Sequence, residues 1–157
     1  MLRVVVDTNV WISALLNPRG LPARVASMSV LSRIVLVSSQ PLLDELHDVL
    51  MRPRIRRKYP LDPKAVMEFT DLLRRRAEMI VTSGAVRLCR DPRDDVVIET
   101  ALAGHAAILV SRDDDLKGDA DLVRHLTERG VTVLSVQRFL DLMDGAPTHH
   151  HSLGTLS

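Results

Sequence analysis

Two predicted strands of this chain end in carboxylates. Asp7 directly follows the apolar run of residues 2–6, and Asp113 comes shortly after the run of residues 106–110. In parallel α/β sheets, ligands gather at the carboxyl ends of the strands. The two acids are therefore expected at one edge of the sheet. Like charges in one site need a cation, or a raised pKa on one member.

Helical geometry selects a third acid. The segment 41–51 has the apolar period of a helix, with its stripe centred between Leu42 and Leu43. Glu45 lies at the edge of this stripe, whereas Asp44 and Asp48 lie on the side that faces solvent. Glu45 is thus the acid of this helix best placed to face inward.

The same construction selects a fourth acid in the helix expected over residues 94–104. Asp94 projects along the apolar face of this helix, whereas Asp95 and Glu99 turn away from it. A carboxylate at a helix N-terminus is also stabilised by the helix dipole and the free N–H groups there.

Each of these acids also has a plain structural explanation. Asp94 is a good N-cap, Glu45 suits a solvated helix edge, and Asp7 can cap a helix entered through Asn9. The run 113–115 can form an exposed turn. Four acids placed inward together nevertheless favour a common site over four separate structural roles.

An all-oxygen cluster selects a hard cation, Mg²⁺ or Mn²⁺, over Zn²⁺, which prefers His or Cys. His47 falls on the polar side of its helix, and neither His105 nor His125 has a partner at metal-ligand spacing. Carboxylate-bound Mg²⁺ most often serves phosphoryl chemistry, in which it activates water and stabilises the leaving oxygen.

Two clusters of cations are available for a phosphodiester substrate. The first is a candidate for binding a nucleic-acid backbone and consists of Arg52, Arg54, Arg56, Arg57 and Lys58. Its alternative is a solvated loop. For the second cluster, Arg74–Arg76, compensation of a helix C-terminal dipole is the favoured explanation. Aromatic residues make up 3% of the chain, so binding should depend on phosphate charge and be salt-sensitive.

Composition indicates one globular α/β domain. The chain has 157 residues, 46% hydrophobic and 26% charged, with a net charge of +1. We expect a domain over residues 1–144 and a flexible tail over 145–157, which carries His149–His151. The single Cys89 excludes an internal disulfide. We expect neither a signal peptide nor a membrane helix, and therefore a cytoplasmic protein.

Short apolar strands alternate with segments of helical period, which is typical of a mostly parallel sheet covered on both faces. The expected strands cover residues 2–6, 34–37, 106–110 and 131–134. The expected helices cover residues 21–31, 42–50, 63–73 (with Asp62 as N-cap and Pro63 at its start), 94–104, 120–129 and 135–143.

Four segments resemble the PIN-domain family of metal-dependent ribonucleases, and within it the toxins of bacterial and archaeal toxin–antitoxin modules. They are VVVDTNVWISALL (4–16), SSQPLLDELHDVL (38–50), RDPRDDVVIETALA (90–103) and LVSRDDDL (109–116). The resemblance covers roughly residues 2–142. It implies a three-layer α/β/α sandwich with about five strands.

The resemblance also implies roles for single residues. The family's four acids fall on Asp7, Glu45, Asp94 and Asp113, as catalytic residues and ligands of Mg²⁺ or Mn²⁺. Asn9 falls on a position that supports the first acid by hydrogen bonding. Asp95 stands where relatives often have Asn, and Asp115 can share the role of Asp113; both join Asn9 as supporting residues.

The implied function is endoribonuclease cleavage of RNA phosphodiester bonds by a toxin, with an antitoxin protein and a second copy of the chain as partners. A catalytically inactive PIN scaffold that binds RNA stays open. A haloacid-dehalogenase-like phosphatase would use Asp7 as a nucleophile, but it needs an acid where this chain has Asn9. A receiver-like domain would need a lysine after its last strand, and none is evident.

Overall fold

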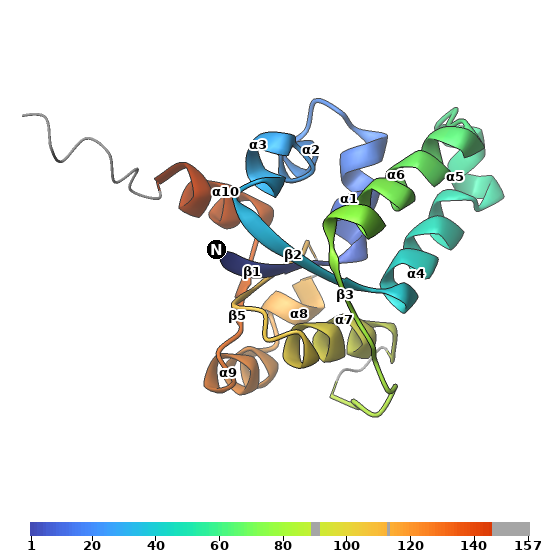
Figure 1. Cartoon of the computed structure of the whole chain (residues 1–157). Helices are drawn as coiled ribbons and strands as arrows, with labels where there is room; N and C mark the ends of the chain where they lie inside the picture. Colours follow the sequence, from blue (N-terminus) through green and yellow to red (C-terminus); the bar gives the residue numbers. More distant parts are fainter. Residues whose placement is uncertain (89–91, 113, 146–157) are drawn as a thin grey trace, which may run out of the picture.

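A five-stranded parallel sheet forms the middle layer of the computed structural model (Figure 1). Its order is β3-β2-β1-β4-β5, and every pair of neighbours is parallel. The strands are β1 (Leu2–Val6), β2 (Ile34–Ser39), β3 (Glu78–Ile80), β4 (Ile108–Val110) and β5 (Thr132–Leu134). The structure describes residues 1–88, 92–112 and 114–145, so most of the expected tail lies outside the described residues.

Helices cover both faces of the sheet, which confirms the three-layer α/β/α sandwich (Figure 1). One layer contains α1 (Thr8–Leu16), α2 (Leu21–Val25), α3 (Met28–Leu31), α4 (Gln40–Leu50), α6 (Pro63–Arg76) and α10 (Val136–Gly145). The other contains α7 (Pro92–Ala103), α8 (Asp114–Lys117) and α9 (Ala120–Glu128). The short helix α5 (Pro53–Lys58) follows α4 and has no buried residue.

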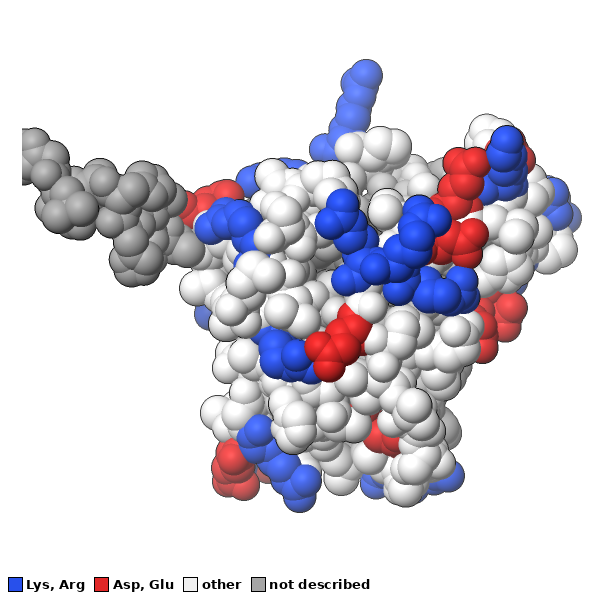
Figure 2. Space-filling view, in the orientation of Figure 1, with Lys and Arg blue, Asp and Glu red and all other residues white. Residues whose placement is uncertain are grey.

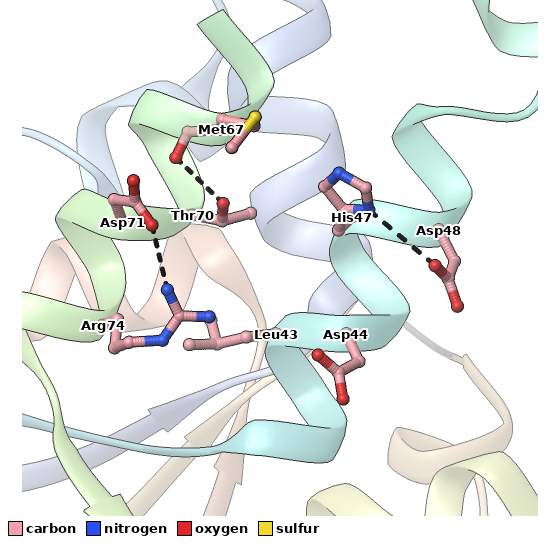
Figure 3. Close-up of a pocket in the computed structure, with 8 residues that line it drawn as sticks. All are labelled: Leu43, Asp44, His47, Asp48, Met67, Thr70, Asp71 and Arg74. Carbon is pink, nitrogen blue, oxygen red and sulfur yellow. Dashed lines mark hydrogen bonds and ion pairs between the residues drawn. The ribbon is translucent and has the colours of Figure 1, made fainter. Parts of the chain in front are cut away.

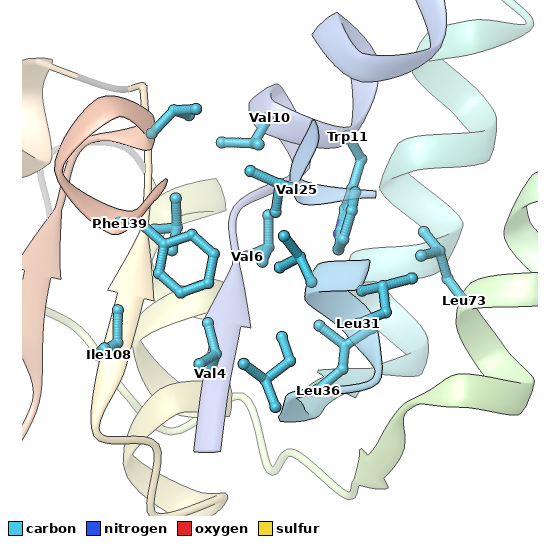
Figure 4. Packing of buried hydrophobic residues seen from close by; sticks show 14 of the residues in the cluster. Val4, Val6, Val10, Trp11, Val25, Leu31, Leu36, Leu73, Ile108 and Phe139 are labelled. Atoms are coloured by element: carbon cyan, nitrogen blue, oxygen red, sulfur yellow. The ribbon is translucent and has the colours of Figure 1, made fainter. Parts of the chain in front are cut away.

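Alternation along the central strand divides the core between the two faces. Val4 and Val6 pack into one hydrophobic cluster and Val5 into the other, as the period of two in a strand requires. Figure 4 shows the first cluster, in which Trp11 and Phe139 pack close to these valines. Both faces of β1 are thus buried, so its end at Asp7 is held in a fixed position.

The sequence patterns locate most elements but not all. The predicted N-cap is confirmed, because Asp62 accepts a hydrogen bond from the N–H of Lys64 at 3.0 Å. The single helix expected over 21–31 is wrong: the chain forms α2 and α3, separated by residues 26–27. The loop alternative for the basic segment is also wrong, because residues 53–58 form α5 with a proline at its start.

The amino edge of the sheet is held by an ion pair. Arg3 of β1 donates to both carboxylate oxygens of Glu78 on β3, at 2.8 and 3.1 Å, and its Nε donates to the carbonyl of Gly104 at 2.9 Å. This bond with Arg3 holds the pKa of Glu78 below its usual value. Gly104 fits closely here, because a Cβ would lie 2.5 Å from Cγ1 of Val37.

Candidate active site

Asp7 stands at the carboxyl end of β1, beside the end of β4. Val6 is in register with Val110, so the next residues along, Asp7 and Ser111, are neighbours. The N–H of Asp7 donates to the carbonyl of Val110 at 2.8 Å, and the Ser111 hydroxyl donates to Oδ2 of Asp7 at 2.8 Å. Asp7 is only 8% exposed. The carboxylate is therefore buried, and a second strand orients it.

Glu45 reaches the same edge from α4. Leu42, Leu43 and Leu46 bury one side of this helix, and Glu45 is half-buried at the margin of that side. The hydroxyl of Thr8, the residue after Asp7, donates to Oε2 of Glu45 at 3.4 Å. The carboxylates of Asp7 and Glu45 are thus connected through one residue. Asp44 and Asp48 are exposed, as the helical wheel predicts.

Asp94 lies half-buried in the first turn of α7, and two other acids of this helix are buried by the segment that precedes it. Asp95 and Glu99 are 5% and 7% exposed. Asp95 accepts the N–H of Leu88 at 2.8 Å, and Glu99 accepts the N–H groups of Ser83 and Gly84. The helical wheel places these two acids away from the apolar face of α7, and they are nevertheless buried. The segment before α7 covers them, and a wheel built from apolar residues does not register such backbone contacts.

Asn9 supports the site through the segment that follows β4. Its side-chain oxygen accepts the N–H of Arg112 at 3.3 Å, and the adjacent Ser111 is the residue that contacts Asp7. Asn9 is thus linked to the first acid through residues 111–112. The guanidinium of Arg112 also donates to the Ser13 hydroxyl, one turn after Asn9 on α1.

Sequence reasoning missed two hydroxyls, those of Ser111 and Thr8. Both residues are buried, and each bonds to one of the predicted acids. A signal was present for Ser111, because it directly follows the apolar run at 106–110, as Asp7 follows the run at 2–6. In a parallel sheet, the residues that follow two neighbouring strands lie side by side.

The structure describes three of the four predicted acids, Asp7, Glu45 and Asp94. Asp113 and the side chain of Asp115 lie outside the described residues. Within the described residues, no three Asp, Glu, His or Cys side chains form a group that could hold a metal ion by themselves. The chemistry of the donors fits a hard cation, because Asp7, Glu45 and Asp94 offer only carboxylate oxygens.

A separate groove of about 360 Å³ lies between α4 and α6 (Figure 3). Its lining comprises Leu43, Asp44, His47, Asp48, Met67, Thr70, Asp71 and Arg74. Asp71 and Arg74 form an ion pair at 2.9 Å, and Nδ1 of His47 lies 3.8 Å from Asp48. Asp7, Glu45 and Asp94 do not line it, so this groove is distinct from the predicted site.

The basic residues at the end of α4 are all exposed. They are Arg52, Arg54, Arg56, Arg57 and Lys58. None of them pairs with a carboxylate in the part of the chain that the structure describes, whereas Arg74 pairs with Asp71 on α6. In the space-filling view, basic side chains stand at the α5 end of the molecule and over the end of α6 (Figure 2).

No helix among the described residues is long and apolar enough to cross a membrane.

Comparison with known proteins gives concordant results. The sequence profile of the PIN domain matches residues 3–115, a range that includes all four predicted acids. An uncharacterized protein of Methanocaldococcus jannaschii is 30% identical over 122 residues, which cover 78% of this chain and 74% of that protein. The crystal structure of FitAcB from Neisseria gonorrhoeae has a similar fold. Its TM-score is 0.52 at 16% identity, over 85% of this chain and 98% of that chain.

The profile match extends over more than half of the chain and begins and ends on the strands and acids described above. The layered sheet with its acidic carboxyl edge agrees with it. The chain therefore belongs to the PIN domain family of nucleases.

Proposed function

We propose that this chain is a Mg²⁺- or Mn²⁺-dependent endoribonuclease that hydrolyses RNA phosphodiester bonds. The observation that carries the proposal is the pair of carboxylates at one sheet edge, Asp7 and Glu45, each oriented by a hydroxyl. Asp94 at the start of α7 and Asp113 complete the proposed set of catalytic residues and metal ligands. Asn9, Asp95 and Asp115 are the proposed supporting residues.

The protein's own contribution is orientation. A bound divalent ion would activate a water molecule and stabilise the leaving oxygen. Ser111 fixes the rotation of the Asp7 carboxylate through Oδ2, and Thr8 does the same for Glu45. Asp95 and Glu99 fix the segment that leads to α7, and with it the approach to Asp94. Oriented ligands cost less reorganisation when substrate and metal bind.

The α5 cations form the proposed contact with the RNA backbone. They are Arg52, Arg54, Arg56, Arg57 and Lys58. Leu50, the last residue of α4, lies five residues beyond Glu45, about 8 Å along the helix, and the cluster begins two residues later at Arg52. Exposed cations without a carboxylate partner lose little on meeting a phosphate, and counterion release then favours binding.

The proposal also includes the partners of the protein, its location and the limits of its domain. By its resemblance to the toxin subgroup, the chain would act as a toxin and be inhibited by a cognate antitoxin protein. A homodimer, a cytoplasmic location, a PIN domain over 1–144 and a flexible tail over 145–157 belong to the same proposal. An inactive, RNA-binding PIN scaffold is the alternative. Membership of the PIN family favours either reading over the phosphatase.

The deciding experiment is cleavage of labelled RNAs and single-stranded DNA with Mg²⁺, Mn²⁺ or EDTA. We expect cleavage of RNA that EDTA abolishes. Asp7→Asn should lower it by more than about 100-fold, since loss of an outer-shell partner alone costs about 10–100-fold. Asp48→Asn removes an exposed acid from α4 and is the matched control. Full activity in Asp7→Asn, or cleavage in EDTA, would refute the metal site. Folded protein that binds RNA without cleaving it would identify the scaffold.

The α5 contact has its own test. Replacing Arg54, Arg56 and Arg57 with Gln should weaken RNA binding and make its salt dependence shallower, because fewer counterions are released. Binding is measured in EDTA at several salt concentrations. The control is Arg124→Gln, which removes a positive charge from an exposed arginine on α9. An unchanged salt slope in the triple variant would mean that α5 is a solvated helix that does not contact the RNA.

A further inference from the structure

We propose that Arg112 binds a phosphate of the RNA that neighbours the scissile one. This inference rests on the proposed nuclease function and adds a second phosphate contact beside the acids. It is carried by the position of Arg112, which directly follows the serine that orients Asp7 and is itself fixed to α1.

Three hydrogen bonds fix the position of residues 111–112. The N–H of Ser111 donates to the carbonyl of Leu134 on β5 at 3.0 Å, and its hydroxyl donates to Asp7. The N–H of Arg112 donates to Asn9 at 3.3 Å. The side chain of Arg112 therefore leaves the chain from a fixed point at the edge of the site.

The direction of the side chain is fixed as well. The guanidinium donates to the hydroxyl of Ser13 on α1 and is exposed to solvent. A guanidinium has five N–H donors, so this bond leaves most of them for a ligand. No carboxylate among the described residues forms an ion pair with it. A planar fork of donors beside a nuclease site suits a phosphate.

The distance from the acids defines which phosphate is bound. Ser13 lies six residues beyond Asp7, which is about 9 Å along α1 at the rise of a helix. The guanidinium bonded to Ser13 is thus positioned for a phosphate next to the one at the Asp7–Glu45 site. Arg112 should therefore hold the substrate at a flanking phosphate, and its loss should affect binding more than the chemical step.

A purely structural tie between the segment after β4 and α1 would look similar in the structure. The two roles differ in which variants matter. A tie is lost in both Arg112→Ala and Ser13→Ala, whereas a phosphate contact is lost only in Arg112→Ala and is kept as a charge in Arg112→Lys.

The test combines binding and kinetics on one short, labelled single-stranded RNA. Binding is measured at several salt concentrations in Asp7→Asn protein, which should not cleave the RNA. We expect Arg112→Ala to reduce the magnitude of the salt slope by about 0.7, the value for one phosphate on a single strand. Arg112→Lys and Ser13→Ala should retain the slope. With Asp7 intact, Arg112→Ala should raise KM and leave kcat within about twofold.

A control and three contrary outcomes complete the design. Arg129→Ala removes an exposed cation after α9, close to the amino edge, and should change neither the slope nor KM. If Ser13→Ala reproduces the effect of Arg112→Ala, or if Arg112→Ala lowers kcat and thermal stability together, Arg112 is only a tie. An unchanged slope with normal cleavage also overturns the inference. Absence of any metal-dependent cleavage by the wild-type protein is a different result, since it refutes the proposed nuclease itself.

Discussion

Acidic side chains have different hydrogen-bond partners at the two ends of the parallel strands, which are called here the amino edge and the carboxyl edge of the sheet. At the amino edge, Glu78 receives two hydrogen bonds from the guanidinium of Arg3. At the carboxyl edge, Asp7 and Glu45 receive hydrogen bonds from the hydroxyls of Ser111 and Thr8. A guanidinium offsets the charge of a carboxylate, whereas a hydroxyl fixes the direction of a carboxylate oxygen without adding a charge of its own. The Arg3–Glu78 pair links two strands, and the two hydroxyl bonds orient the carboxylates of the predicted site.

Among the variants that test this difference, Ser111→Ala should have the largest effect on activity. The change removes the donor to Asp7 and leaves the charge of the carboxylate unaltered. Metal-dependent activity should fall by about 10–100-fold, as it does when a partner that orients a metal ligand is lost. The measurement is kcat/KM for RNA cleavage at several Mg²⁺ concentrations.

Ser39→Ala is the matched control for this change. Ser39 is also buried at the carboxyl end of its strand, but its hydroxyl bonds to Thr100 at 2.9 Å. Both variants should lose stability by about 0.5–3 kcal/mol, because each removes a hydrogen bond between buried polar groups. Equal losses of activity in the two would show that orientation of Asp7 is not what Ser111 provides.

The next effect concerns only the amino edge. In Gly104→Ala, the new Cβ would lie 2.5 Å from Cγ1 of Val37 and 2.9 Å from the carbonyl of Thr100. We expect a loss of about 1–3 kcal/mol in the free energy of unfolding, because a tightly packed core must shift. Activity per folded molecule should be nearly unchanged, since Arg3 and Gly104 lie away from the acids. Urea denaturation and the cleavage assay measure the two quantities.

Gly145→Ala is the control for this substitution, because no atom lies within 4 Å of the position where its Cβ would stand. Its free energy of unfolding should not fall below that of the wild-type protein, because Gly145 ends α10 and Ala is at least as favourable as Gly in a helix. Wild-type stability in Gly104→Ala would mean that the amino edge is not closely packed. A large loss of activity in the folded variant would mean that the two edges are coupled.

Much of the fold could be predicted from the sequence, because the buried strands are nearly continuous apolar runs. The run before Asp7 is one such strand, and its alternating contacts with two helical layers follow from the pleat. The strand β3 was missed, because it has three residues and begins with a charged one, Glu78. It takes its place in the sheet by pairing with β2, and Glu78 is also bonded to Arg3, which is 75 residues away in the sequence.

In the candidate site, too, some features could be predicted from the sequence and others depend on tertiary contacts. The exposure of Asp44 and Asp48 follows from helical period alone, and so does the half-buried position of Glu45. The burial of Asp95 and Glu99 depends on backbone N–H groups of the preceding segment, which no periodicity describes. The hydroxyl of Ser111 acquires its role only when β4 lies beside β1. Local patterns thus identify the acids, and tertiary contacts determine how the acids are oriented.

The smallest effect is expected from Glu78→Gln, which removes the charge of the amino-edge acid. The pKa of Glu78 is lowered by Arg3, so the ionised carboxylate stabilises the folded state. This contribution is present above the ordinary carboxyl pKa of 4.5 and is lost as the pH falls through the lowered value. The wild-type protein should therefore have the higher Tm at neutral pH, and the difference should shrink as the pH falls below 4.5.

The Glu78 effect should be modest, because the side chains of Arg3 and Glu78 are 31% and 51% exposed and water and salt screen the pair. Thermal unfolding from neutral to acid pH measures it, and Glu68→Gln on α6 is the control, since Glu68 is exposed and has no ion pair among the described residues. Added salt should reduce the difference at neutral pH. A difference that grew on acidification would contradict the lowered pKa. It would also remove the contrast between an amino edge whose acid is bonded to a guanidinium and a carboxyl edge whose acids are bonded to hydroxyls.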